Sequence, residues 1–276
     1  MTEQLSVDGG TIAYDVAGEG PLVVLAPGMG NGRDAYRFVA PALVAAGYRV
    51  ATTDLRGAGE SSAGWASYSR TDIAGDLVAL IRHLGGPAVL VGHSISGGAA
   101  TIAAATAPGL ITGVVELAPF TRAQGVTLGD LRHRAYRKGF MRIAGTMLGS
   151  LNSWKSYLDL AYPGRKPADW DAQIAGTAAM LSEPGRMKAL QKMMQASPAD
   201  AGAQLGNVQC PVLIIEGTLD PDWADPRAEG TAIVAELPDG RGSLAMVEGA
   251  GHYPHAQYPE ETTALILTFL RAYADA

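Results

Sequence analysis

The chain has 276 residues, of which 47% are hydrophobic and 17% charged, and its formal net charge is −6. This composition disfavours disorder. Because the net charge is negative and no long basic run occurs, we do not expect a nucleic-acid partner. A chain of this length is compatible with one α/β core that carries an insertion. The single cysteine, Cys210, precludes an intrachain disulfide and fits a reducing compartment.

The N-terminal sequence lacks the basic start and apolar stretch of a signal peptide. No segment reaches the roughly 18 uninterrupted apolar residues of a membrane-spanning helix. We therefore expect a cytoplasmic protein, monomeric or homodimeric, with no membrane partner.

Short apolar runs alternate with longer segments of helical character, which is typical of parallel strands buried on both faces. The first segment alternates more loosely and indicates an antiparallel edge strand, so we expect a mixed sheet. In chain order, the predicted strands are Thr11–Gly18, Leu22–Ala26, Tyr48–Thr53, Pro87–Val91, Val114–Leu117, Val212–Glu216 and Leu244–Val247. The predicted core helices are Tyr36–Ala46, Arg70–Leu84, a helix that follows Ser94 and extends through Ala107, and Pro259–Ala274.

The segment 120–208 interrupts this alternation with helical patterns and no convincing strand. Prolines and glycines divide it into roughly four helices, because proline disfavours a helical conformation in the residue before it. We interpret it as a helical cap inserted between the sixth and seventh strands, with residues 1–119 and 209–276 forming the core domain. Methionines are concentrated in the cap, where they either pack it against the core or form an adaptable apolar surface. They are Met141, Met147, Met180, Met187, Met193 and Met194.

A serine stands where a predicted strand gives way to a helix, in the sequence Val91-Gly-His-Ser-Ile-Ser-Gly-Gly98. A serine on such a sharp turn has a strained backbone that lifts its hydroxyl above the sheet edge, and small neighbours such as Gly92 and Ser96 are needed there. The following helix directs its N-terminal amides toward the site, so the N–H of Ile95 is a candidate oxyanion donor. The alternative is that Ser94 only caps the helix.

A nucleophilic serine needs a base, and the base needs an acid that holds the correct tautomer. Asp220 follows the strand that begins at Val212, and His252 follows the last predicted strand. Because the carboxyl ends of parallel strands share one edge of a sheet, we expect Ser94, Asp220 and His252 to converge.

Other residues compete for these roles. Asp222 and Asp225 lie near Asp220, but only Asp220 completes the Gly-x-x-Asp spacing after the strand. Glu116, within the preceding strand, is another candidate acid, and His255 is another candidate base. His252 is preferred because it directly follows a glycine-flanked turn.

Three motifs, in the order Ser, Asp, His, resemble the α/β-hydrolase superfamily: Gly92-His-Ser-Ile-Ser-Gly97, Gly217-Thr-Leu-Asp220 and Gly249-Ala-Gly-His252. The turn Asp54–Ser61 is similar to the turn after the family's fourth strand, and the insertion stands where the family carries its cap. The resemblance implies an α/β-hydrolase fold, a mostly parallel eight-stranded sheet flanked by helices with a helical cap insertion.

Two residues depart from the family pattern. Pro27 stands where the oxyanion loop usually has histidine, and Ser96 stands where glycine commonly closes the turn around the nucleophile. By position, the resemblance makes Met29 the second oxyanion donor beside Ile95. The turn around Ser94, with Ser96 in it, also resembles the corresponding turn of small-molecule receptors derived from hydrolases.

These observations predict a serine hydrolase with Ser94 as nucleophile, His252 as base and Asp220 as the orienting acid. The expected substrate is a small to medium, largely apolar ester, thioester or lactone, and no metal or organic cofactor is implied. Carbon–carbon bond hydrolysis by the same triad and a small-molecule sensor with slow turnover are the alternatives. Six apolar cap residues either line the pocket or, as we expect more often, pack within the cap: Phe140, Met141, Leu148, Trp154, Tyr157 and Leu158.

Overall fold

An eight-stranded sheet in the order β1-β2-β4-β3-β5-β6-β7-β8 forms the centre of the molecule. The computed structural model describes residues 2–123 and 125–274. Strands β1 and β2 pair antiparallel to their neighbours, and the remaining strands are parallel. The strands are β1 (Glu3–Val7), β2 (Gly10–Ala17), β3 (Leu22–Ala26), β4 (Arg49–Thr53), β5 (Ala88–His93), β6 (Ile111–Leu117), β7 (Val212–Gly217) and β8 (Gly242–Val247).

The predicted strands agree with β2 to β8 to within a few residues, and the mixed sheet is confirmed. Every residue of β3 and of β5 is buried, because helices cover both faces of the sheet. Strand β1 was not among the predicted apolar runs. It lies at the sheet edge, where all five of its residues are exposed or half-buried.

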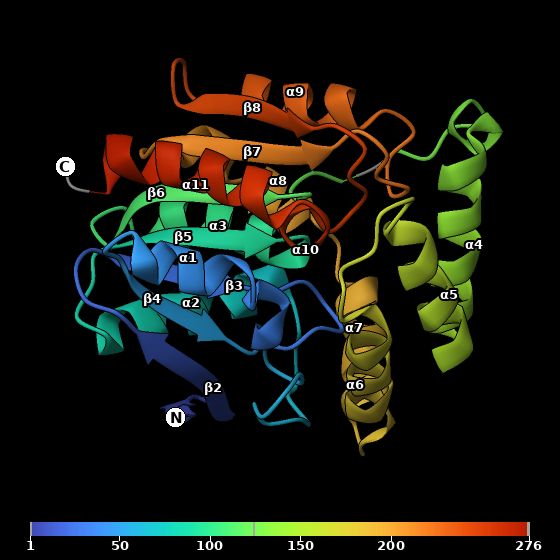
Figure 1. Cartoon of the computed structure of the whole chain (residues 1–276), viewed down its shortest axis with the longest axis horizontal. Helices are drawn as coiled ribbons and strands as arrows, with labels where there is room; N and C mark the ends of the chain where they lie inside the picture. Colours follow the sequence, from blue (N-terminus) through green and yellow to red (C-terminus); the bar gives the residue numbers. More distant parts are fainter. Residues whose placement is uncertain (1, 124, 275–276) are drawn as a thin grey trace.

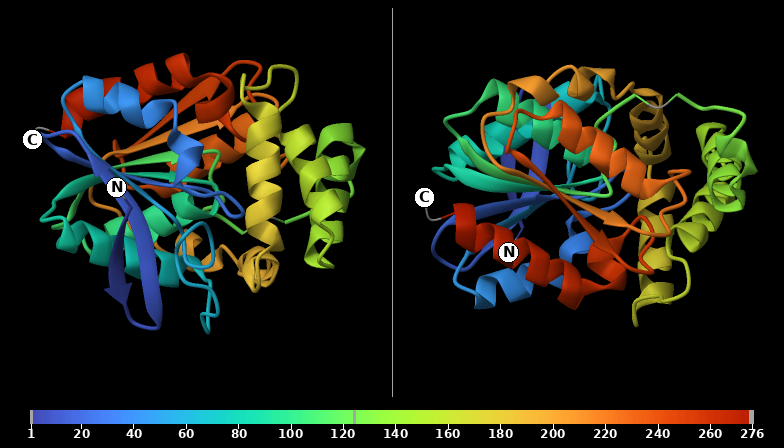
Figure 2. Two further views of the ribbon diagram at one scale, coloured as in Figure 1. Left: turned by 60° about the horizontal axis from the view of Figure 1, so that its bottom comes forward. Right: turned by 90° about the horizontal axis from the view of Figure 1, so that it is seen from above.

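Two helical layers enclose the sheet (Figures 1 and 2). Helices α1 (Val39–Ala45) and α11 (Pro259–Tyr273) pack on one face, and α2 (Arg70–His83), α3 (Ile95–Thr106) and α9 (Pro226–Glu236) pack on the other. The expected helix Tyr36–Ala46 was wrong at its start, because residues 33–36 form the 3-10 turn η1 (Arg33–Tyr36). Helix α9 escaped prediction, since it buries only Gly230 and Ile233.

Helices α4 to α7 form a cap between β6 and β7, as the sequence predicted. They lie together beyond the end of the sheet toward which the parallel strands run (Figure 1). Aromatic packing joins this cap to the core, since the ring of Tyr162 stacks on that of Tyr253 with centroids 4.6 Å apart. The elements are η2 (Asp130–Arg132), α4 (Arg134–Met147), α5 (Leu151–Ala161), α6 (Trp170–Ser182), α7 (Arg186–Gln195), α8 (Ala199–Gly202), η3 (Leu205–Asn207) and, in the core, α10 (Pro254–Gln257).

The residue ranges of the two domains stay a prediction, and residues 1, 124 and 275–276 of those ranges lie outside the described structure. Within residues 2–123 and 125–274, no helix combines the length and apolarity needed to cross a lipid bilayer.

Glu116 lies near the carboxyl end of β6 and is fully buried. The hydroxyls of Thr101 and Thr121 donate hydrogen bonds to its carboxylate. Burial raises the pKa of Glu116 to about 7, against the effect of these two hydrogen bonds. The folded chain therefore holds a proton on Glu116 at pH values where the unfolded chain has released it.

We expect Glu116→Gln to flatten the dependence of folding stability on pH. Glu116 has a higher pKa in the folded state, so its contribution to stability is greatest below pH of about 4 and is lost as pH rises toward 7. Urea unfolding measures the free energy of unfolding at pH 5 and at pH 8. The decrease from pH 5 to pH 8 should be about 2 kcal/mol smaller in the variant than in the wild type. The exposed Glu248→Gln is the matched control. An equal pH dependence in Glu116→Gln and the wild type would contradict this account.

Candidate active site

Ser94 occupies a strained turn between β5 and α3. Its backbone has φ 55° and ψ −118°, a conformation that non-glycine residues rarely adopt. The turn is fixed from both sides, because Ser94 N donates to the Leu117 carbonyl at 2.9 Å and Phe120 N donates to the Ser94 carbonyl at 3.1 Å. A Cβ at Gly92 would lie 2.2 Å from the Ser96 carbonyl oxygen, so the turn requires glycine there. The Ser94 side chain makes no capping hydrogen bond, which argues against the simple N-cap alternative.

The structure brings Asp220 and His252 together at the same end of the sheet. His252 Nδ1 and Asp220 Oδ2 are 2.8 Å apart, and both side chains are buried. The two loops that carry them are in close contact, since a Cβ at Gly217 would lie 2.2 Å from the Gly251 carbonyl oxygen. Ser94 and His252 line one cavity of about 300 Å³. No hydrogen bond joins the Ser94 hydroxyl to His252 in the described part of the chain, and such contacts often tighten only when substrate binds.

The competing candidates have other partners. The Glu116 carboxylate accepts hydrogen bonds from Thr101 and Thr121, and Asp225 caps α9 by accepting from Ala228 N. His255 is buried, and neither ring nitrogen has a hydrogen-bond partner among the described residues. Burial lowers its pKa to about 3.

Asp222, in contrast, is a second acid at the histidine. Its Oδ2 lies 3.3 Å from His252 Nδ1, and its backbone N–H donates to Asp220 Oδ1 at 2.9 Å. The hydroxyl of Tyr157, on cap helix α5, donates to Asp222 Oδ2 at 2.5 Å. Sequence reasoning weighed Asp222 only as a replacement for Asp220, because the contact with the cap cannot be read from spacing.

The charge of His252 depends on these two acids. Burial by itself lowers the pKa of His252, but the carboxylates of Asp220 and Asp222 outweigh it and raise this pKa to about 9. Burial also raises the pKa of Asp222.

The loop that carries Met29 lies against the serine turn. A Cβ at Gly28 would lie 2.6 Å from His93 Nδ1, so only glycine permits this close approach. The Ser96 hydroxyl donates to the Pro27 carbonyl at 2.6 Å and ties the loop to the turn. Met29 lines the cavity, and Ile95 begins helix α3 directly after Ser94. The backbone N–H groups of Met29 and Ile95 stay our predicted oxyanion donors.

Most of the cavity wall is apolar, and the cap supplies much of it. Of the six candidate wall residues, Trp154 and Tyr157 line the cavity. The side chains of Phe140, Met141 and Leu148 are exposed, and Leu158 packs inside the cap. The sequence did not single out Arg70, which also lines the cavity. The available signal was its position as a basic residue in the first turn of a helix, where the helix dipole disfavours a positive charge.

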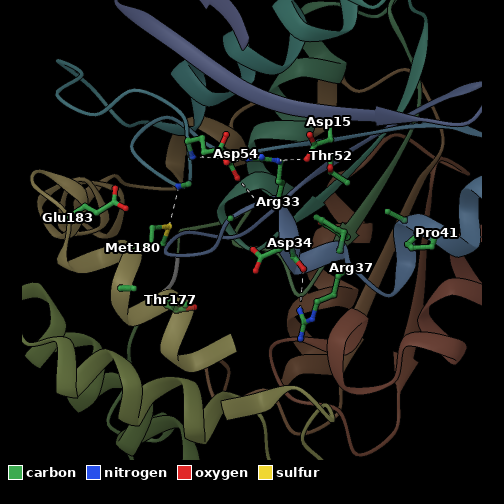
Figure 3. A pocket seen from close by; sticks show the side chains of 17 residues that line it. Asp15, Arg33, Asp34, Arg37, Pro41, Thr52, Asp54, Thr177, Met180 and Glu183 are labelled. Atoms are coloured by element: carbon green, nitrogen blue, oxygen red, sulfur yellow. Dashed lines mark hydrogen bonds and ion pairs between the residues drawn. The ribbon is translucent and has the colours of Figure 1, made fainter. Parts of the chain in front are cut away.

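A second hollow of about 660 Å³ lies between the core and α6 (Figure 3). Its central cation, Arg33, is already paired with Asp15, Asp54 and Glu60. Ser94 and His252 are not among its lining residues. The smaller cavity is therefore the candidate active site, because Ser94 and His252 line it.

Asp220, Asp222 and His252 also present potential ligand atoms within 4.8 Å of one another, which is close enough for a metal ion. Hydrogen bonding between acids and a histidine brings the same atoms equally close. His252 Nδ1 and Asp220 Oδ2 are already joined by such a hydrogen bond.

Comparison with known proteins identifies similar chains. The sequence pattern described as "Alpha/beta hydrolase family" matches residues 23–265. BpoC of Mycobacterium tuberculosis, provisionally named a non-heme bromoperoxidase, is 30% identical over 94% of this chain and 97% of its own. The 2-(acetamidomethylene)succinate hydrolase of Mesorhizobium japonicum is 26% identical over 96% of this chain and 94% of its own. The solved structure of an esterase from Exiguobacterium antarcticum has a TM-score of 0.81 at 19% identity, covering 98% of this chain and 100% of that one.

We expect Asp222→Asn to lower the pKa of His252 by roughly one unit, because one of the two carboxylates beside Nδ1 loses its charge. The chain has five histidines, so NMR titration of the ring protons can follow His252 directly, with a His252→Gln spectrum for its assignment. Asp225→Asn, which removes a nearby charge that caps α9, is the matched control. An unchanged His252 titration in Asp222→Asn would show that Asp222 does not govern its charge.

Proposed function

Because the chain belongs to the Alpha/beta hydrolase family, whose pattern spans residues 23–265, we propose that it is a serine hydrolase with Ser94 as the nucleophile. It cleaves a small to medium, largely apolar carboxylic ester, thioester or lactone through an acyl-enzyme intermediate. The observation that carries this proposal is the strained serine turn, which opens into the same cavity as a histidine paired with a buried aspartate.

In the proposed reaction, Ser94 Oγ attacks the substrate carbonyl while neutral His252, the form that predominates above its pKa of about 9, accepts the hydroxyl proton. Asp220 holds the ring with Nδ1 protonated and stabilises the imidazolium that forms. The N–H groups of Met29 and Ile95 stabilise the oxyanion. His252 then donates its proton to the leaving oxygen or sulfur, and water releases the acyl group by the same steps in reverse order.

The size and lining of the cavity support this substrate class. A volume of about 300 Å³ suits a small ligand, and the wall formed by Met29, Phe120, Trp154 and Met193 suits apolar groups. The names of the relatives include hydrolases of several kinds, and two structural neighbours are described as esterases. A serine at the nucleophile position argues against the epoxide-hydrolase activity named for other relatives, since that chemistry uses a carboxylate.

Two other functions keep the same site. Carbon–carbon bond hydrolysis needs the same serine and histidine, and a substrate panel separates it from ester hydrolysis. A small-molecule sensor would react once with each chain, so a single stoichiometric burst without further turnover would favour it. Loss of activity with a chelator would instead indicate a metal at Asp220, Asp222 and His252.

We expect Ser94→Ala to reduce hydrolysis of p-nitrophenyl butyrate by about 10³-fold or more, because the acyl-enzyme can no longer form. A fluorophosphonate probe should label Ser94 in the wild type, and mass spectrometry of the labelled peptide should locate it. Ser182→Ala is the matched control, because it removes the hydroxyl of an exposed serine on α6 that does not line the cavity. Full turnover by a folded Ser94→Ala protein, as judged by circular dichroism, would refute the proposed nucleophile.

A further inference from the structure

Arg70 is a buried cation in the wall of the cavity that contains Ser94 and His252. It is the first residue of α2, directly after the N-cap Ser69, and only 3% of its surface is exposed. Its Nε donates to the Phe120 carbonyl at 2.8 Å, and its Nη1 donates to the Ala196 carbonyl at 3.1 Å. The guanidinium therefore reaches from the core to the end of cap helix α7.

No carboxylate of the described residues forms an ion pair with Arg70. The acid that influences it, Asp200, instead accepts hydrogen bonds from the backbone and side chain of Thr71. Burial lowers the pKa of Arg70 to about 10, which still leaves it charged at neutral pH. The dipole of α2 further disfavours the positive charge, since Arg70 is the first residue of the helix.

Arg56, which is buried, and Arg33, which is half-buried, are instead neutralised by carboxylates. Arg56 forms two 2.8 Å hydrogen bonds with the Asp76 carboxylate, and Arg33 pairs with the buried Asp54. A buried charge is normally paired in this way, because desolvation is costly. Arg70 differs in having only neutral carbonyl partners and in facing a cavity.

An anion that enters the cavity would supply the missing charge. An arginine has more N–H donors than its two hydrogen bonds to carbonyls use, and its planar fork suits a carboxylate. The acid in the wall, Asp222, is already engaged by Tyr157 and His252. The remaining wall is largely apolar, which strengthens an ion pair within it.

We propose that Arg70 binds a carboxylate on the acyl side of the substrate, so that the preferred substrates are half-esters of short dicarboxylic acids or close analogues. This inference rests on the proposed function, and it assigns one end of the substrate to Arg70 and the other to Ser94. Arg70 is a binding residue that determines specificity, and it takes no part in proton transfer.

The test compares charged and neutral esters of matched shape. Monoethyl succinate, glutarate and adipate are each paired with an ethyl ester in which an isopropyl group replaces the terminal carboxylate, and ethanol release is measured. The wild type should prefer at least one half-ester by tenfold or more in kcat/KM. Arg70→Met should lower kcat/KM for that half-ester by about 10- to 100-fold and leave its neutral partner within about threefold. Arg122→Met, which alters an arginine outside the cavity, should keep the wild-type preference.

A structural role for Arg70 predicts a different result. If Arg70 only holds the cap, Arg70→Met lowers both rates equally, which would overturn the proposal, as would the lack of any half-ester preference in the wild type. Arg70→Lys keeps the charge and should recover part of the preference if the methionine variant folds poorly.

Binding can be read without turnover. Adipate or glutarate should raise the melting temperature of Ser94→Ala but not of the double variant with Arg70→Met. A failure of ester hydrolysis and of fluorophosphonate labelling would refute the serine mechanism alone. The absence of a melting shift with both adipate and glutarate would refute the carboxylate site.

Discussion

The strained backbone at Ser94 is the constraint on which the surrounding structure depends. A residue with φ 55° in a buried turn persists only when its neighbours fix it, and here β6 and Phe120 bind both its N–H and its carbonyl. Close packing then dictates the residues nearby. A Cβ at Gly97 would lie 2.7 Å from the Pro119 side chain, and one at Gly98 would lie 2.8 Å from the side chain of Arg70. The glycines at the start of α3 therefore serve both the serine turn and the position of the guanidinium.

The cap and the histidine loop form one hydrogen-bonded unit. His252 N donates to the Ala161 carbonyl at the end of α5 with a 3.0 Å bond, and Gln257 donates to the carbonyls of Pro163 and Arg165 in the following loop. Tyr157 of the same helix reaches Asp222. A shift of α5 would thus alter the backbone and the charge environment of His252 together, which makes the cap part of the site as well as its cover.

The sequence predicted the features that follow from strand order. It did not predict the contacts between the cap and the core. Buried strands leave continuous apolar runs, and parallel strands bring their ends to one edge, so the proximity of Asp220 and His252 followed from two short motifs. Strand β1 and helix α9 bury too little to leave such a pattern. The contacts of Tyr157 with Asp222 and of Arg70 with Ala196 join residues separated by 65 and 126 positions, and they depend on how the cap rests on the core.

The two departures from the family pattern meet in space. Proline at position 27 supplies no backbone N–H, but its carbonyl accepts a hydrogen bond from the Ser96 hydroxyl at 2.6 Å. A glycine at position 96 would leave that buried carbonyl without this donor and would leave the loop carrying Met29 less firmly attached. Since Gly28 already fixes the distance between this loop and His93, the bond from Ser96 adds a second point of attachment. Pro27 and Ser96 together position the loop. The Ser96 hydroxyl, although close to the nucleophile, is engaged by its hydrogen bond to the Pro27 carbonyl.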